Sequence, residues 1–146
     1  MLLELSDNYG YSILSMFTYN GRLSVLQFIV DSGSEYTCCH ASSIGTLSEE
    51  YCELMQYDKE FQFGVLQGDN SLSVCFYKIP VDNFSLGSTI KLGRQFIYVT
   101  FDDRFSSLLL GRDILNKMYF YHAVRDEKLC LSVDYDEIKE MVETYQ

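Results

Sequence analysis

Proline, basic residues and long apolar runs are all scarce in this chain of 146 residues. With one proline and 47% apolar residues, the composition can bury a core, which argues against intrinsic disorder. The chain has 11 basic and 21 acidic residues, and its net charge of −10 argues against a nucleic-acid or anionic-membrane partner, since both need a basic face. No apolar run approaches the ~20 residues that span a bilayer. The first residues also lack the basic start and apolar stretch of a secretory signal.

The cysteines are odd in number and show no CxxC spacing: Cys38, Cys39, Cys52, Cys75 and Cys130. This pattern argues against a disulfide framework and favours reduced thiols, so we expect a cytoplasmic protein. Cys38-Cys39-His40 could suggest a metal site. Adjacent side chains of an extended strand point to opposite faces, however, and structural zinc requires other spacings. We therefore expect no metal and no cofactor.

Short β-favouring runs make up most of the first forty residues. Leu2, Leu3 and Leu5 suggest an amino-terminal strand. Two longer runs, 11–18 and 23–30, flank Asn20-Gly21, which predicts a hairpin with a two-residue type I′ turn. Residues 36–39 are expected to be extended again, and Ala41–Gly45 to form a helical turn that its glycine ends.

The middle of the chain predicts one helix followed by several strands. Thr46-Leu-Ser-Glu49 has the form of a capping box that opens a helix over 47–57. From 61 to 101 the pattern has period two, with a hairpin whose tip lies near 68–70. Pro80 is expected at a sheet edge or a break, and Gly87 and Gly93 should separate further strands.

The carboxyl-terminal part predicts a hairpin and a helix. Residues 119–124 and 129–133 form the expected hairpin. Asp134 can cap a last helix whose apolar stripe is Ile138, Met141, Val142 and Tyr145.

A carboxylate stands at the end of an apolar strand in Phe28-Ile-Val-Asp-Ser-Gly-Ser34. Such an acid is costly to bury unless it is hydrogen-bonded or paired. Two interpretations stay open on this stretch alone. Asp31-Ser32-Gly33 is a common turn composition, and it is also a candidate catalytic turn.

A second motif lies eighty residues later, in Leu108-Leu-Leu-Gly-Arg-Asp-Ile-Leu115, where a buried strand stops at a glycine before a short helix. Together the two motifs resemble those of the retropepsin-like aspartic proteases, the single-lobe family of retroviral proteases and their relatives. The first is similar to the family's apolar–Asp–Thr/Ser–Gly–Ala/Ser, and the second to its apolar–apolar–Gly–Arg–Asn/Asp segment. The order of hairpins and motifs follows the family from about residue 11 to 133.

This resemblance implies a mainly β fold, a closed barrel with one or two short helices, and here an added C-terminal helix over 134–146. The whole chain, 1–146, is then a single retropepsin-like domain. The family hydrolyses peptide bonds with two carboxylates that share one proton, because like charges so close cannot both ionise. This sequence holds one Asp-Ser-Gly. The second carboxylate must come from another copy, so we expect a two-fold homodimer with one Asp31 from each subunit.

The resemblance also assigns roles to other residues. Ser32 would bond across the dimer axis, and the Gly33 backbone would border the substrate. Arg112 would pair with Glu35 and, together with Gly111, support the turn. The substrate-binding set would be Gly33, Glu35, Leu66, Gln67, Gly68, Asp69 and Asn70, the last five at the flap.

Three points stay open at the level of sequence. The main hypothesis is an aspartic endopeptidase that acts on polypeptides; the alternative is a catalytically silent dimerisation or protein-interaction module with the same fold. The last helix could cover a sheet edge or the dimer interface. His40 and His122 have no predicted place near Asp31, and serine or cysteine hydrolase chemistry would lack a positioned base.

Overall fold

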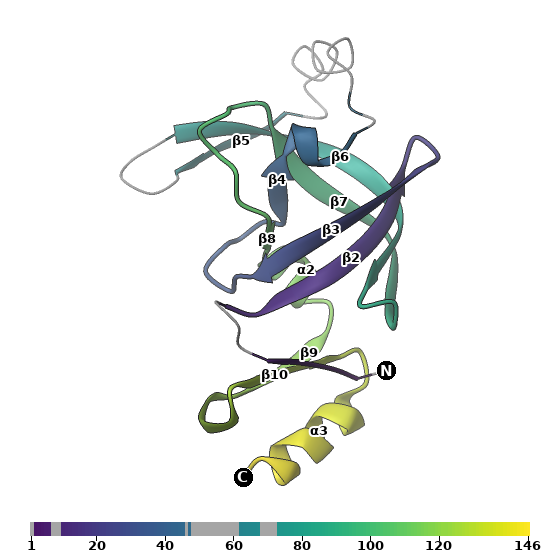
Figure 1. Ribbon diagram of the computed structural model, residues 1–146, viewed down its shortest axis with the longest axis vertical. Helices are drawn as coiled ribbons and strands as arrows, with labels where there is room; N and C mark the ends of the chain where they lie inside the picture. Colours follow the sequence, from purple (N-terminus) through teal and green to yellow (C-terminus); the bar gives the residue numbers. More distant parts are fainter. Residues whose placement is uncertain (1, 7–9, 46, 48–61, 68–72) are drawn as a thin grey trace.

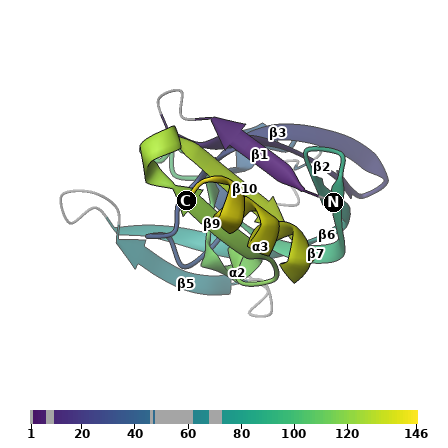
Figure 2. The ribbon, with the colours of Figure 1, turned by 90° about the horizontal axis from the view of Figure 1, so that it is seen from below.

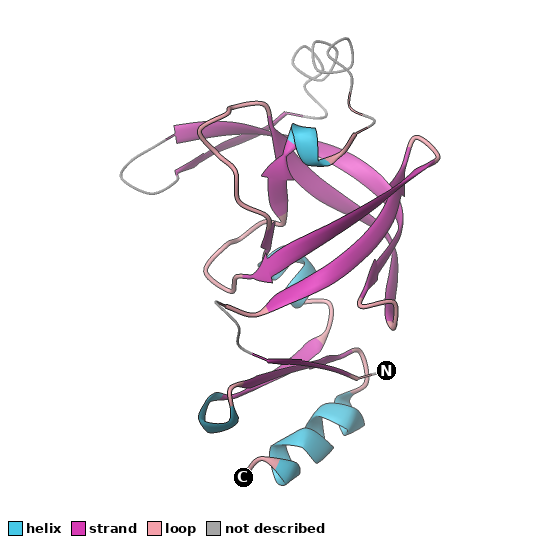
Figure 3. Cartoon of the chain, in the orientation of Figure 1, coloured by secondary structure: helices cyan, strands magenta, loops and turns pink. Residues whose placement is uncertain are grey.

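The computed structural model describes residues 2–6, 10–45, 47, 62–67 and 73–146. Strands dominate this part of the chain, and the helices are short (Figures 1 and 3). The strands are β1 (Leu3–Ser6), β2 (Ser12–Tyr19), β3 (Arg22–Val30), β4 (Cys38–His40), β5 (Gln62–Gln67), β6 (Ser73–Leu86), β7 (Ile90–Thr100), β8 (Leu109–Leu110), β9 (Tyr119–Ala123) and β10 (Lys128–Ser132). The helices are the 3₁₀ turns η1 (Ala41–Ser43) and η3 (Val124–Asp126) and the α-helices α2 (Arg112–Leu115) and α3 (Tyr135–Thr144). Within these ranges no helix has the length and hydropathy needed to cross a membrane.

The larger sheet closes on itself as a barrel. Its described strands follow the order β2-β3-β8-β4-β7-β6, and β6 pairs with β2 to complete the ring. The β3–β8 and β4–β7 pairs are parallel and the other long pairings are antiparallel, while β5 adds to β6 alone. Closure removes the open edges that a flat sheet would expose. The expected mainly β, barrel-like fold is therefore confirmed.

The first hairpin forms as its turn chemistry predicts. Tyr19 pairs with Arg22, which leaves Asn20 and Gly21 as a two-residue connection. Their φ angles are 50° and 75°, the left-handed pair that a type I′ turn requires. Asparagine and glycine adopt this conformation at low cost, so the local sequence is enough to determine the register of β2 and β3.

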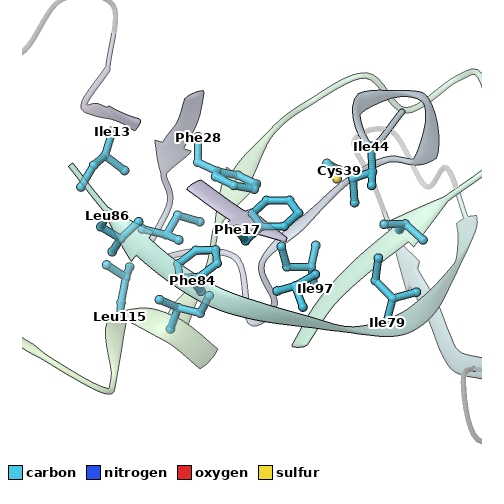
Figure 4. Close-up of a cluster of buried hydrophobic side chains, with 14 of the residues drawn as sticks. Ile13, Phe17, Phe28, Cys39, Ile44, Ile79, Phe84, Leu86, Ile97 and Leu115 are labelled. Atoms are coloured by element: carbon cyan, nitrogen blue, oxygen red, sulfur yellow. The ribbon is translucent and has the colours of Figure 1, made fainter. Parts of the chain in front are cut away.

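Alternate residues of the barrel strands fill a common core (Figure 4). On β2, Ile13 and Phe17 are buried while Leu14 between them is exposed. Phe17 stacks on Phe84 of β6 with ring centroids 6.0 Å apart. Period-two alternation thus places one face of each strand in the interior, and Phe28 on β3 anchors the strand that leads to Asp31.

Two local expectations are changed by the structure. Gly93 does not end a strand: it takes a φ of 69° inside the continuous strand β7, where the register with β6 shifts at Phe84. A glycine in a left-handed conformation accommodates a bulge, so the ladder continues beyond it. The turn η1 ends at Ile44 in an extended conformation, not at Gly45.

Pro80 does lie at a break in the pairing of β6. One flank of β6 pairs with β5 up to Tyr77 and with β2 from Asp82, so Pro80 lies in the interval between them. The capping box at Thr46 and most of the helix expected over 47–57 lie outside the described residues.

A smaller sheet carries both ends of the chain at one end of the barrel (Figure 1). Its order is β1-β10-β9, and both pairings are antiparallel. Asp134 caps α3 by accepting a hydrogen bond from the Asp136 backbone N–H at 2.9 Å, as the sequence predicts. Ile138 is the buried member of the predicted apolar stripe.

Candidate active site

Asp31 follows the last residue of β3 in a turn that the backbone holds on both sides. Its N–H donates to the Leu110 carbonyl at 3.0 Å, and its carbonyl accepts from the Ser34 N–H at 3.1 Å. One residue earlier, the Val30 N–H donates to the Tyr11 carbonyl at 2.7 Å. These hydrogen bonds join the turn to β8 and to the start of the first hairpin. The position of Asp31 is therefore fixed by the backbone of the barrel.

The Asp31 side chain is oriented by the glycine two residues later. The Gly33 N–H donates to Asp31 Oδ1 at 2.9 Å. A Cβ at position 33 would lie 3.1 Å from the same oxygen, so glycine is what leaves room for this contact. Asp31 is half-buried, while Ser32 and Gly33 are exposed. The turn therefore orients the Asp31 carboxylate through its own backbone and leaves part of that carboxylate accessible to solvent.

Gly111 brings the second motif into contact with the first. A Cβ on Gly111 would lie 2.4 Å from both the carbonyl carbon and the oxygen of Tyr36, so only glycine fits here. Thr37 joins the same two segments: it accepts from the Gly111 N–H at 3.0 Å and donates to Asp113 Oδ1 at 2.7 Å. Asp113 Oδ1 also accepts from the Ile114 N–H at 2.9 Å. The turn and α2 thus form one hydrogen-bonded unit.

The expected Glu35–Arg112 ion pair is absent from the ion pairs of the described residues. Both side chains are exposed, and the contact between their segments is made by the backbone. The Arg112 N–H donates to the Ser34 carbonyl at 2.8 Å and the Asp113 N–H to the Glu35 carbonyl at 3.1 Å. Since α2 begins at this point, its first free N–H groups serve the turn, and Asp113 rather than Arg112 provides the inward side chain.

Of the five flap residues expected to bind substrate, the structure describes the backbone of two. Leu66 and Gln67 lie in β5, opposite Val74 and Ser73 of β6. The hairpin predicted here is therefore formed by β5 and β6, while its tip, Gly68, Asp69 and Asn70, lies outside the described residues.

A pocket of about 220 Å³ lies between the candidate turn and the smaller sheet. Ser32 reaches it from the turn, and His122 from β9. The Tyr11 hydroxyl and His122 Nε2 are hydrogen-bonded at 2.9 Å, with their rings edge to face at 5.0 Å. The residues that line the pocket are Tyr11, Val30, Ser32, Leu115, Phe120, His122, Leu129 and Leu131.

The sequence did not predict a role at the site for two residues, Thr37 and His122. Thr37 carried no motif signal, since its role depends on α2 lying beside it. His122 had no predicted place near Asp31, yet it shares a pocket with Ser32. A residue ninety positions away reaches this site only through the packing of β9 under the barrel.

The thiols next to the turn are protected by burial. Burial raises the pKa of Cys38 to about 12, with a further contribution from the Asp113 carboxylate, and burial likewise raises the pKa of Cys39 to about 12. The Cys38 and Cys39 thiols therefore stay protonated near neutral pH and are poor nucleophiles.

His40, the next residue, is hydrogen-bonded to Asp103 Oδ1 at 3.0 Å and to the Ser42 hydroxyl at 2.8 Å.

The geometry therefore brings together Asp31, Ser32, Gly33 and Gly111, four residues that the sequence proposed for the site. Glu35 follows on the same loop with an exposed side chain. One oriented carboxylate at an exposed turn can activate a water molecule if a second acid shares its proton.

Comparison with known proteins bears on the fold. No family model matches the chain, and no curated protein matches it either. Among solved structures, the chain is similar to a retropepsin-like aspartic protease from Rickettsia conorii. The match has a TM-score of 0.53 and covers 90% of each chain at 16% sequence identity. The chain described here has a retropepsin-like fold.

Proposed function

We propose that the protein is an aspartic endopeptidase that hydrolyses peptide bonds in polypeptides. The observation that carries this proposal is the Asp31 turn: a carboxylate at the exit of a barrel strand accepts the Gly33 N–H at 2.9 Å. It does so in a chain that shares its fold with a retropepsin-like aspartic protease. A half-buried carboxylate at an accessible turn, directly after a barrel strand and oriented by a backbone N–H, is suited to a catalytic position.

The chemistry requires two copies of Asp31. With one proton between them, the ionised carboxylate accepts a proton from a water molecule, which then attacks the scissile carbonyl carbon. The protonated carboxyl donates to the carbonyl oxygen as the tetrahedral intermediate forms. A single Asp-Ser-Gly per chain makes a homodimer the working unit, with an isologous interface that puts both carboxylates at the axis.

The remaining roles surround this pair. Ser32 bonds across the axis, Gly33 and Glu35 border the substrate backbone, and residues 66–70 complete the proposed substrate-binding set. Gly111 and α2 hold the turn in place. The chain works as one retropepsin-like unit over about 11–133, followed by the helical extension 134–146. The four cysteines in the described part of the chain are unpaired, which suits a reducing, cytoplasmic setting.

Cleavage of a peptide library between pH 4 and pH 8 tests the proposal. Wild type should release products, and Asp31→Asn should release none, because an amide cannot take the proton from water. Asp82→Asn is the matched control, since Asp82 is an exposed acid of β6 outside the turn, and it should cleave like wild type. Equal products from wild type and Asp31→Asn would refute the mechanism. A dimer that cleaves nothing would instead support the silent interaction module.

A further inference from the structure

A second group of apolar side chains packs on the outside of the barrel, apart from the core. The members of this outer cluster are Cys38, Val74, Phe76 and Tyr98, with Tyr36, Phe105 and Leu109 packed against them. In the sheet, Cys38 pairs with Leu109 on one side and with Tyr98 on the other, and residues in register share a face. Cys39, the next residue, lies in the barrel core. Since successive side chains of a strand point to opposite faces, the outer cluster covers the face turned away from the barrel interior.

The Asp31 turn opens onto the same face as the outer cluster. Ile29 of β3 pairs with Leu109, and Asp31 follows Ile29 by two residues, which is the spacing of side chains on one face. The charges agree with this placement. Burial and the Asp113 carboxylate raise the pKa of the Cys38 thiol, and the Asp31 carboxylate also contributes. The carboxylate proposed for catalysis is therefore a neighbour of the outer cluster.

The base of the β5–β6 hairpin forms the other side of the outer cluster. Val74 and Phe76 belong to the stretch of β6 that pairs with β5, and β5 projects outward from the barrel (Figure 2). Phe105 packs on Phe76 from the loop between β7 and β8, with ring centroids 5.1 Å apart. The outer cluster thus extends from the Asp31 turn to this hairpin, and a polypeptide bound at Asp31 would cross it.

Two tyrosine rings belong to the part of the outer cluster that follows the turn. Tyr36 and Tyr98 meet edge to face with ring centroids 4.8 Å apart. Tyr36 is half-buried, whereas Tyr98 is only 8% exposed. The Tyr36 ring is therefore partly presented to solvent and supported by the second ring. The face of an aromatic ring carries negative charge density, which attracts a cation.

Two carboxylates add negative charge around this tyrosine pair. Burial raises the pKa of Tyr36, and Glu35 adds to the increase through its charge and a hydrogen bond. Burial also raises the pKa of Tyr98, with further contributions from the charges of Asp113, Tyr36 and Glu35. Neither Glu35 nor Asp113 takes part in an ion pair among the described residues. Aromatic faces and carboxylates together make a surface that suits a cation.

The basic side chains of the chain around this surface are directed elsewhere. Lys78 is the cross-strand neighbour of Tyr98, but its Nζ lies 4.2 Å from the centroid of the Phe96 ring. Arg104 donates to a carboxylate of its own loop, and Arg112 is exposed at the start of α2. The contact of Lys78 also shows that this face of the sheet already holds one cation against an aromatic ring.

We propose that Tyr36, Tyr98 and Glu35 form a subsite for a lysine or arginine side chain of the substrate, so that the protein acts on basic polypeptides. The cation lies against the Tyr36 ring, while Glu35 and Asp113 supply the opposite charge. The net charge of −10 attracts such polypeptides before they bind. The inference rests on the proposed function, because it assigns a substrate class to the same site. Tyr36 and Glu35 determine specificity and take no part in the chemical step.

Binding to Asp31→Asn, which should cleave nothing, tests the subsite apart from catalysis. The probes are short apolar peptides with one lysine moved through every position, each matched by a peptide with norleucine there, which keeps the aliphatic stem and lacks the charge. Calorimetry at pH 6, where lysine and most carboxylates are charged, should show at least ~5-fold tighter binding of lysine at one position. Added salt should reduce this ratio through screening. Equal affinities at every position would overturn the proposal.

Paired variants test whether the ring and the carboxylate cause the preference. In the Asp31→Asn protein, Tyr36→Leu and Glu35→Gln should each lower the ratio of lysine to norleucine affinity about 3-fold, whereas Tyr36→Phe keeps the ring and should keep the ratio. Asp82→Asn is the control, since it removes the same charge from an exposed position of β6 that pairs with β2. An unchanged ratio in Glu35→Gln, or in a folded Tyr36→Leu, would overturn the proposal.

Cleavage by the wild type separates this inference from the proposed function. Products of the peptide library should be enriched in lysine or arginine at one fixed position relative to the scissile bond. Cleavage without this enrichment, together with equal affinities of the lysine and norleucine peptides, would refute the subsite and keep the function. A preference for lysine in binding, with no cleavage by the wild type, would refute the function and keep the subsite.

Discussion

Replacing Gly111 with alanine tests how the two motifs of the site are held together. The new Cβ would lie 2.4 Å from the carbonyl carbon and oxygen of Tyr36 and 2.8 Å from its nitrogen. All three are backbone atoms, so no side-chain rotation can relieve the contact. The loop that begins at Asp31 or the start of α2 must move, and the hydrogen bond from the Gly111 N–H to Thr37 Oγ1 must stretch.

The cost has two parts. Forcing an extra methyl group into a packed interior costs about 1–3 kcal/mol, and contact with backbone places this case at the upper end. Loss of the buried hydrogen bond adds about 1 kcal/mol. We therefore expect a decrease of about 3–4 kcal/mol in the free energy of unfolding. For a chain of this size that lowers Tm by roughly 6–16 °C, at about 2–4 °C per kcal/mol.

Urea unfolding followed by circular dichroism measures this change against a matched control. Gly45→Ala makes the same substitution at an exposed glycine whose added Cβ meets no atom within 4 Å. It should change stability by no more than ~0.5 kcal/mol. If Gly111→Ala is as stable as Gly45→Ala, the close approach of the two motifs is not required, and the reasoning fails.

Two further outcomes follow from the same structure. Thr37→Val should cost about 1–3 kcal/mol by urea unfolding, because it leaves the buried Gly111 N–H without its acceptor, whereas Thr37→Ser should keep most of the stability. At the surface, hydrogen bonds from Arg104 lower the pKa of Asp102 to about 2, so the stabilising contribution of this pair is complete above about pH 4 and is lost as the pH falls through 2. A ¹³C NMR titration should show the Asp102 pKa return towards 3.8 in Arg104→Gln, and an unchanged value would contradict the assignment.

Elements with strong local chemistry were predictable from the sequence. Asn20-Gly21 determined the first hairpin and its register, since few other conformations suit that pair. Asp134 predicted the start of α3 in the same way. The apolar run into Asp31 and the run into Gly111 each marked a strand that ends abruptly. These features depend on neighbours in the chain, which is why a linear pattern reveals them.

Features that depend on distant neighbours were not predictable to the same degree. Gly93 reads as a strand end, but cross-strand pairing with β6 carries β7 through it as a bulge. The sequence predicted an ion pair between Arg112 and Glu35, but the start of α2 contacts that loop through backbone N–H groups instead. In both cases tertiary hydrogen bonding decides between options that the local sequence leaves equal.

The linear pattern was enough to predict a β-rich chain with a carboxylate at the exit of one strand, because apolar alternation and turn residues act between near neighbours. The retropepsin-like barrel was predicted from the resemblance of two spaced glycine motifs to those of that family. The groups that support and surround that carboxylate could be found only in the folded chain. Thr37 reaches Gly111 and Asp113 across more than seventy residues, and His122 reaches the pocket beside Ser32 from another sheet. Such contacts exist only once the chain has closed on itself, since their partners are neighbours in space and not in sequence.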